Sequence, residues 1–242
     1  MPYGNDLAWL TRRPIAHRGL HDGNVSVPEN SLAAARAAIE AGYPIECDVQ
    51  LSSGGTPYIF HDDTLDRLAR TDGAFRDADD RRLGALRLVG TDQAMPTVAE
   101  FLRLIDGRVP VVMELKGVGA DKDGDYLARL LPMIEPYRGR LALMSFDEWL
   151  IDQALQADGP WPVGLTAEGT EPAVLDRHRA IYDRGCAFTS YNVDHLDNDF
   201  VRYVRNERRD PVISWTVRSP ADQRRSAALA DQITFEGFLP QS

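Results

Sequence analysis

The sequence predicts an α/β protein with a closed (β/α)8 fold, a TIM barrel. Short apolar runs alternate with amphipathic helical stretches along the chain, and about eight of these runs have the character of parallel strands. A length of 242 residues suits one such barrel. Reactive side chains follow several of the runs, whereas an open doubly wound sheet, the alternative, would gather ligand contacts near one switch point. Residues 1–242 are therefore interpreted as a single barrel domain.

The first elements set the alternation of strand and helix. A strand is expected at residues 14–17 and a helix at Ser31–Ala41. Asn30 can cap the start of this helix, and Gly42 can end it. The next expected elements are strands at 43–49 and 57–61, helix Thr97–Ile105, strand Pro110–Leu115 and helix Tyr126–Ile134.

The second half of the chain continues the same pattern. Its expected strands are 140–146, 161–166, 186–191, 211–217 and Asp231–Phe235, and its helices lie near 147–156, 171–183, 195–208 and 220–229. The chain ends too soon after the last strand for another helix, so Asp6–Thr11 is expected to cover that part of the barrel. Residues 62–95 are too long for a simple connection and predict a small insertion after the second strand.

The amino-acid composition limits the kinds of partner that the protein can be expected to bind. The net charge of −10 and the pI near 5.0 argue against binding to nucleic acid or to an anionic membrane. We expect a cytoplasmic protein without stable membrane insertion, because the sequence has neither a signal peptide nor an apolar run of roughly 18 residues. Cys47 and Cys186 lie within expected strands and are interpreted as buried, reduced thiols. The oligomeric state is left open.

Acidic side chains at strand ends predict a metal site. Glu46 and Asp48 are two residues apart, so on a strand they point to the same face, while Cys47 points to the other. Glu114 supplies a third carboxylate from the end of another expected strand. Three carboxylates can hold one hard divalent cation, Ca²⁺ or Mg²⁺. Salt bridges to buried arginines are the alternative interpretation.

Basic and aromatic side chains accompany these acids. His17 and His61 each end an apolar run and can transfer protons, and Arg18 and Lys116 can neutralise a phosphate group. Together with the metal site they describe metal-assisted cleavage of a phosphate ester. Trp215 ends a strand, where it packs in the core or forms an apolar wall beside the substrate. The other histidines have no comparable neighbours and are expected on the surface or in loops: His21, His178 and His195.

The order of these motifs resembles that of the glycerophosphodiester phosphodiesterase family. The matching segments extend over nearly the whole chain: His17-Arg18-Gly19, Pro28-Glu29-Asn30-Ser31, Ile45-Glu46-Cys47-Asp48-Val49, Phe60-His61-Asp62, Leu65-Asp66-Arg67, Met95-Pro96-Thr97, Glu114-Leu115-Lys116, Ser145-Phe146 and Trp215-Thr216. The resemblance implies a TIM barrel with a small insertion after the second strand. It also implies hydrolysis of a small-molecule glycerophosphodiester to glycerol 3-phosphate and an alcohol.

The resemblance assigns roles to the same residues. It implies one Ca²⁺ or Mg²⁺ ion on Glu46, Asp48 and Glu114, and His17 and His61 as the acid–base pair. Arg18 and Lys116 would contact the phosphate. The family often ends its last strand with Thr-Asp followed by proline, whereas this chain has Glu236 in that region. Two interpretations are open: Glu236 replaces the aspartate at the barrel rim, or the rim differs from that of the family.

Two other functions remain open at this stage. The first is a lysophospholipase D-type lipid phosphodiesterase on the same scaffold, for which Leu86, Leu88 and Phe238 would supply apolar rim residues. The second is a barrel that binds a phosphate ligand without catalysis. All the motif residues are present, which favours the enzyme.

Overall fold

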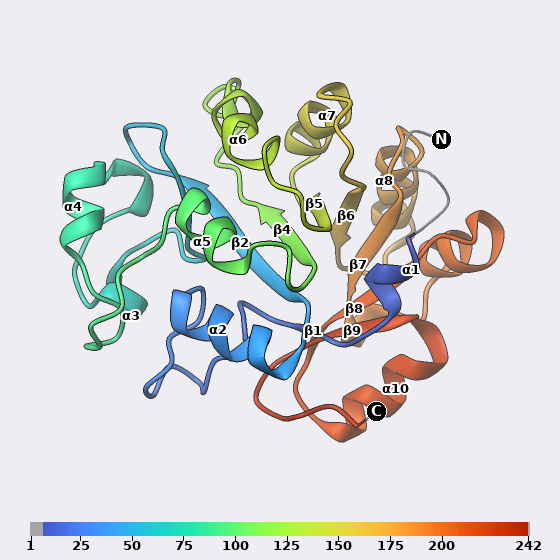
Figure 1. Ribbon diagram of the computed structural model, residues 1–242. Helices are drawn as coiled ribbons and strands as arrows, with labels where there is room; N and C mark the ends of the chain where they lie inside the picture. Colours follow the sequence, from blue (N-terminus) through green and yellow to red (C-terminus); the bar gives the residue numbers. More distant parts are fainter. Residues whose placement is uncertain (1–6, 242) are drawn as a thin grey trace.

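A nine-stranded sheet forms the centre of the computed structural model, which describes residues 7–241 (Figure 1). All strands except β3 run parallel to their neighbours, and pairing of Ala16 in β1 with Ile45 in β2 closes them into a barrel. The predicted closed (β/α)8 fold is confirmed. The strands are β1 Ile15–Ala16, β2 Ile45–Leu51, β3 Pro57–Ile59, β4 Val111–Leu115, β5 Leu141–Ser145, β6 Val163–Ala167, β7 Phe188–Asn192, β8 Val212–Val217 and β9 Gln232–Phe235.

Helices surround the barrel and connect most successive strands. They are α1 Ala8–Thr11, α2 Leu32–Ala41, α3 Asp66–Ala69, η1 Phe75–Asp77, α4 Asp80–Ala85, α5 Val98–Ile105, α6 Tyr126–Ile134, α7 Glu148–Gln156, α8 Pro172–Tyr182, η2 Val193–His195, α9 Asp199–Arg202, η3 Tyr203–Arg208 and α10 Pro220–Leu229. None of the helices between residues 7 and 241 is both long and apolar enough to cross a bilayer.

Side-chain alternation along the strands separates the core from the site. Cys47 and Val49 of β2 join the large apolar cluster between the sheet and the helices, as their parity predicts. Glu46 and Asp48 therefore face the inside of the barrel. The lower interior is filled by a smaller apolar cluster that includes Val112, and the charged groups lie above it towards the carboxyl ends of the strands.

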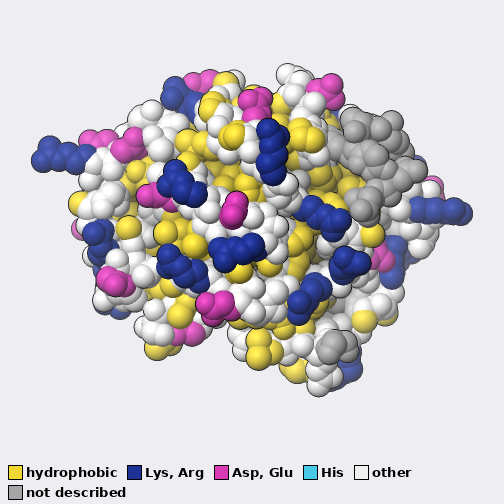
Figure 2. All heavy atoms as spheres, viewed as in Figure 1, with side chains coloured by type: hydrophobic (Ala, Val, Ile, Leu, Met, Phe, Trp, Pro, Cys, Tyr) yellow, Lys and Arg dark blue, Asp and Glu magenta, His cyan; other side chains and the backbone are white. Residues whose placement is uncertain are grey.

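Helix α1 closes the amino-terminal end of the barrel. Trp9 and Leu10 are buried against inward-facing side chains such as Val112 and Ile213. Of the expected covering segment Asp6–Thr11, Asp6 lies outside the described residues, and the remainder fills the barrel interior rather than the outer position of a missing helix. The space-filling view in the orientation of Figure 1 shows no histidine among the described side chains that are visible in it (Figure 2).

Residues between β3 and α5 build a small unit beside the barrel. Strand β3 runs antiparallel to β2, with Val49 opposite Ile59, and α3, η1 and α4 follow it. These segments have their own apolar cluster, in which Phe60 stacks on Phe75 with ring centroids 5.0 Å apart. In Figure 1, α3 and α4 project to one side of the barrel. This unit includes residues 62–95, whose interpretation as an insertion stays a prediction.

The start of α2 corrects one prediction. The Ser31 hydroxyl caps the helix by accepting a hydrogen bond from the Ala34 N–H at 3.1 Å, whereas Asn30 was expected to do so. Asn30 has a φ of 55° and donates its amide to Asp48 instead. The left-handed Gly42 ends the helix as predicted.

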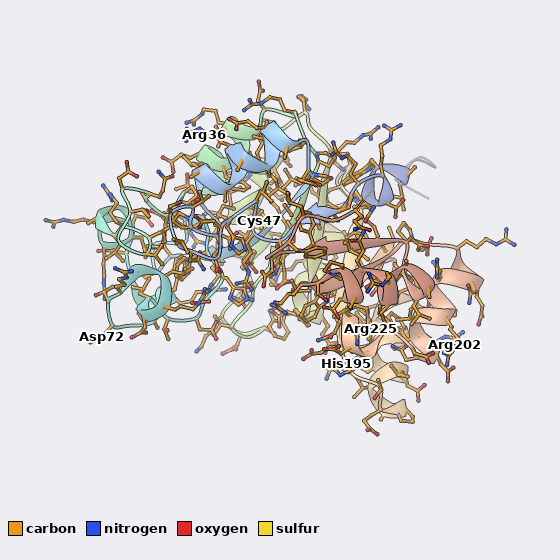
Figure 3. All side chains as sticks on the ribbon, turned by 90° about the horizontal axis from the view of Figure 1, so that it is seen from below. Arg36, Cys47, Asp72, His195, Arg202 and Arg225 are labelled. Atoms are coloured by element: carbon orange, nitrogen blue, oxygen red, sulfur yellow. The ribbon has the colours of Figure 1, made fainter. Side chains whose placement is uncertain are left out.

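Both cysteines are free and buried, as predicted, and Figure 3 shows Cys47 inside the molecule. Burial raises the pKa of the Cys47 thiol well above its ordinary value and that of Cys186 to about 12. Because the thiolate is the reactive form, neither residue should react with a thiol reagent in the native protein at mildly alkaline pH. Both should react after unfolding in denaturant. Mass spectrometry of alkylated native and unfolded samples checks this prediction, and rapid native labelling at either position would contradict it.

Candidate active site

A cavity of about 520 Å³ opens at the carboxyl ends of the strands, where TIM-barrel enzymes place their active sites. Its lining divides into two parts. The charged half consists of His17, Arg18, Glu46, Asp48, His61, Glu114 and Lys116. The neutral half is defined by Met144, Phe146, Ser190 and Trp215, and the charged residues Asp194, Arg218, Asp222 and Arg225 also line the cavity. All eight predicted site residues therefore line one cavity.

Three carboxylates converge in the charged half. Glu46, Asp48 and Glu114 each offer an oxygen, and these oxygens lie within 4.8 Å of one another. Parallel pairing of β2 with β4 causes this, because it places Asp48 directly opposite Glu114. All three residues are buried. Oxygen atoms in this arrangement are the ligand set that hard divalent cations prefer.

The three buried carboxylates repel one another when they are all ionised. Burial and the charges of Asp48 and Glu114 raise the pKa of Glu46 well above its ordinary value, and burial with the charge of Asp48 raises that of Glu114 to about 7. Burial also opposes ionisation of Asp48, but the charges of Arg18, His61 and Lys116 outweigh it and lower the pKa of Asp48. A divalent cation would let all three ionise, so the residues fit a metal ion.

Two fixed cations flank the carboxylates. Lys116 Nζ lies 3.4 Å from Glu114 Oε1 and 3.9 Å from Asp48 Oδ1. Arg18 Nε lies 3.4 Å from Asp48 Oδ2 but forms no hydrogen bond within the described residues, and its Nη1 donates to Glu29 at 2.6 Å. The Arg18 backbone N–H also donates to Glu46 at 2.9 Å. Arg18 and Lys116 therefore face the cavity, and some of their N–H groups make no short hydrogen bond to the protein.

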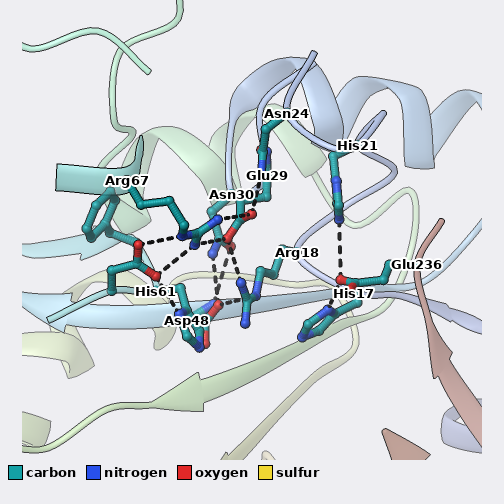
Figure 4. Close-up of polar contacts among 12 residues, drawn as sticks. His17, Arg18, His21, Asn24, Glu29, Asn30, Asp48, His61, Arg67 and Glu236 are labelled. Carbon is teal, nitrogen blue, oxygen red and sulfur yellow. Dashed lines mark hydrogen bonds and ion pairs between the residues drawn. The ribbon is translucent and has the colours of Figure 1, made fainter. Parts of the chain in front are cut away.

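His17 is held by the carboxylate of Glu236. Its Nδ1 lies 2.5 Å from Glu236 Oε2, and its Nε2 faces the cavity 3.9 Å from Glu46 (Figure 4). Burial opposes ionisation of Glu236, but the hydrogen bond from His17 and the nearby His21 and Arg218 outweigh it and lower the pKa of Glu236. Because an ionised carboxylate can only accept, the proton sits on Nδ1 and leaves Nε2 available for chemistry. Glu236, which was expected at the barrel rim, thus orients His17.

His21 lies in a loop, as expected, but it has a charged neighbour that was not predicted. Its side chain is nearly buried, and its Nε2 lies 3.6 Å from Glu236, so it belongs to the same cluster as His17. His178 and His195 lie outside the cavity lining, as expected. His178 packs among aromatic rings, and His195 accepts a hydrogen bond from the Gly169 N–H.

His61 has an equivalent support on the opposite side. Its Nδ1 lies 2.8 Å from Asp62 Oδ1, and Arg67 holds Asp62 through two hydrogen bonds of 2.7 Å. Arg67 also donates two hydrogen bonds to the buried Glu29, which in turn holds Arg18. Figure 4 shows this continuous chain of charges. Sequence analysis gave no role to Glu29 or Arg67, although both lie in segments that carry the family resemblance.

A second buried group of polar contacts fixes the loop that follows Lys116. Arg76 of η1 donates to the Lys116 carbonyl and, at 3.0 Å, to Asp123. The same carboxylate accepts the backbone N–H groups of Val118 and Gly119 and the Trp149 indole N–H. The unit beside the barrel therefore holds the loop that carries a predicted phosphate contact. No sequence motif indicated this arrangement.

We expect Arg76→Met to lower the free energy of unfolding by about 3 kcal/mol, because it removes one partner of a buried ion pair. Arg82→Met is the matched control, since the exposed Arg82 side chain donates to the Asp72 carbonyl and to no carboxylate of the described residues, and it should cost less than about 1 kcal/mol. Denaturant unfolding of the two variants measures the difference. Equal losses would show that the Arg76–Asp123 contact does not stabilise the protein.

Trp215 and Phe146 form the aromatic wall of the neutral half. Their ring centroids lie 5.4 Å apart with an interplanar angle of 87°, and the Trp215 indole N–H donates to the Ser190 carbonyl at 3.0 Å. Trp215 is therefore both packed and part of the cavity lining. The rim residues proposed for a lipid substrate do not line this cavity: Leu86, Leu88 and Phe238 pack in other clusters.

Comparison with known proteins identifies the family. The model of the glycerophosphoryl diester phosphodiesterase family matches residues 17–233. The chain belongs to this family. It is 30% identical to human glycerophosphodiester phosphodiesterase 1 and 46% identical to the rat protein of that name, over 176 residues, or 64% of this chain. It spans about half the length of these curated relatives, 51% in each case.

Solved structures of this family share the fold. A phosphodiesterase of Oleispira antarctica, solved in complex with the product sn-glycerol-3-phosphate, superposes with a TM-score of 0.79 at 23% identity. The match covers 93% of this chain and 92% of that one. At this level of identity the comparison supports the barrel architecture, and the roles of individual residues must come from the geometry of this chain.

Proposed function

We propose that this glycerophosphoryl diester phosphodiesterase family member hydrolyses glycerophosphodiesters to glycerol 3-phosphate and an alcohol with one divalent cation. The observation that carries the proposal is the meeting of three carboxylates, two carboxylate-supported histidines and two fixed cations in one cavity. Family membership supplies the substrate class. An acidic protein needs such local positive charge to bind an anionic substrate.

Glu46, Asp48 and Glu114 would hold the cation, Ca²⁺ or Mg²⁺. When bound, it would supply Lewis-acid stabilisation of the charge that develops on the phosphate oxygens. Arg18 and Lys116 would bind and orient the phosphate, since both face the cavity from the charged half. Trp215 would provide an apolar surface beside the substrate.

His17 and His61 would move the protons. One would take a proton from the attacking oxygen, and the other would give one to the leaving alkoxide as the phosphorus–oxygen bond breaks. Each has Nδ1 committed to a carboxylate, so each presents Nε2 as the reacting atom. Their supports approach from different elements, which allows the pair to flank the phosphate.

The test is release of glycerol 3-phosphate from a panel of glycerophosphodiesters by metal-depleted enzyme, with Mg²⁺, Ca²⁺ and Mn²⁺ added in turn. We expect no turnover without a cation and restoration by at least one of them. Full activity after chelation would contradict the metal role. Binding of a glycerophosphodiester without turnover under all conditions would contradict catalysis and favour a binding barrel.

A further inference from the structure

The neutral half of the cavity contains a buried hydroxyl group without a partner. Ser190 is 1% exposed, and its Oγ makes no hydrogen bond within the described residues although it lines the cavity. A buried hydroxyl left unpaired is unfavourable, so its presence beside an open cavity indicates a ligand that supplies the partner. The backbone carbonyl of Ser190 is already bonded to Trp215, which fixes the residue in place.

The surroundings of Ser190 define the size and polarity of that ligand. Met144 lies deeper in the barrel, and Phe146 and Trp215 form the wall. Above Ser190 on the same strand, Asn192 is fully engaged, because its amide donates to Glu168 at 2.8 Å and its oxygen accepts the Asp194 N–H at 2.9 Å. The ligand group therefore meets the apolar surface of Met144, Phe146 and Trp215, with the Ser190 hydroxyl at its base.

Charged pairs border the mouth of the neutral half. Arg225 contacts both Asp194 at 2.7 Å and Asp222 at 3.1 Å, and Arg218 contacts Glu236 at 2.7 Å. Figure 3 places Arg225 on the opposite side of the molecule from Asp72 of the unit beside the barrel. Arg225 bridges the two aspartates and Arg218 engages Glu236, so these three rim carboxylates each contact an arginine. The same charges offer no apolar path for an acyl chain.

We propose that the neutral half binds the alcohol portion of the substrate and selects small, neutral alcohols with hydroxyl groups, which bond to Ser190 Oγ. This inference rests on the proposed function, because the charged half would then hold the phosphate and the glycerol portion that stays with it. A glycerol or short polyol group fits both the hydroxyl and the aromatic wall. A trimethylammonium group would leave Ser190 unpaired.

The experiment compares two diesters with the same phosphate and glycerol portion, glycerophosphoglycerol and glycerophosphocholine. We expect the full chain with its activating cation to prefer the first in kcat/KM by about tenfold, as the unpaired hydroxyl would otherwise remain buried. Ser190→Ala should abolish that preference, lowering the ratio of the two kcat/KM values by about tenfold. Glycerol should also become a weaker competitive inhibitor of this variant.

Ser214→Ala is the matched control. Ser214 is equally buried on the neighbouring strand but points outward and bonds to Ser226, so its loss should leave the ratio unchanged. Preference for the choline diester, or an equal loss on both diesters in Ser190→Ala, would overturn the subsite. Failure of the wild type to release glycerol 3-phosphate from either diester would instead overturn the proposed function, and the inference with it.

Discussion

Replacing His17 or His61 by alanine should lower kcat by at least about 100-fold, because positioned proton transfer contributes about 10²–10⁴ to an enzymatic rate. The folded structure should survive, since both side chains border a cavity rather than fill the apolar core. Turnover measured against cation concentration tests the assignment. Added cation should not restore either variant, because neither histidine belongs to the carboxylate cluster.

The leaving group separates the acid from the base. Nitrophenolate is a good leaving group that departs without protonation. The variant lacking the general acid should therefore lose much less activity on a nitrophenyl diester than on a natural one. The variant lacking the base should lose about equally on both. His178→Ala is the matched control, because His178 lies on α8 outside the cavity, and it should retain wild-type turnover. Recovery of either active-site variant by added cation would show that its histidine belongs to the metal site.

Strand periodicity was sufficient to predict the barrel and the acidic cluster. Residues two apart on β2 share a face, and parallel pairing brings Glu114 of β4 opposite Asp48. Both follow from local sequence and general rules of α/β architecture. Strand ends differ from the predicted ones by at most two residues, because apolar runs do not mark where backbone pairing stops.

The contacts that hold the site residues in place were harder to predict. Glu236 reaches His17 from the last strand, 219 positions away, and this contact exists only because the barrel closes. Asn30 resembles a helix cap, but the neighbouring Ser31 serves that role and leaves Asn30 to bind Asp48. Local sequence preference therefore predicted the helix correctly but assigned the wrong role to Asn30. The contacts of His21 and Arg76 depend on how loops fold over the barrel, for which the sequence has no periodic signal.

Glu46→Gln should separate metal binding from catalysis. The amide keeps the shape of the side chain and an oxygen to accept the Arg18 N–H, but it removes one negative charge from three carboxylates whose oxygens lie within 4.8 Å. The apparent cation affinity should fall by at least about tenfold, since charged oxygen ligands dominate binding of hard cations. High cation concentration should restore part of the turnover, because mass action can offset a weakened ligand set but not a missing proton donor.

Thermal unfolding gives a readout of the same site without substrate. In the absence of cation, Glu46→Gln should be at least as stable as the wild type, because burial and the charges of Asp48 and Glu114 already disfavour ionisation of Glu46. Added cation should stabilise the wild type, by about 2.7 kcal/mol at a concentration 100 times its Kd, and the variant clearly less. Gln156→Glu changes charge in the opposite direction at the exposed end of α7, away from the cavity, and serves as a control that should keep the wild-type response. Equal stabilisation of wild type and Glu46→Gln at every cation concentration would place the binding site elsewhere.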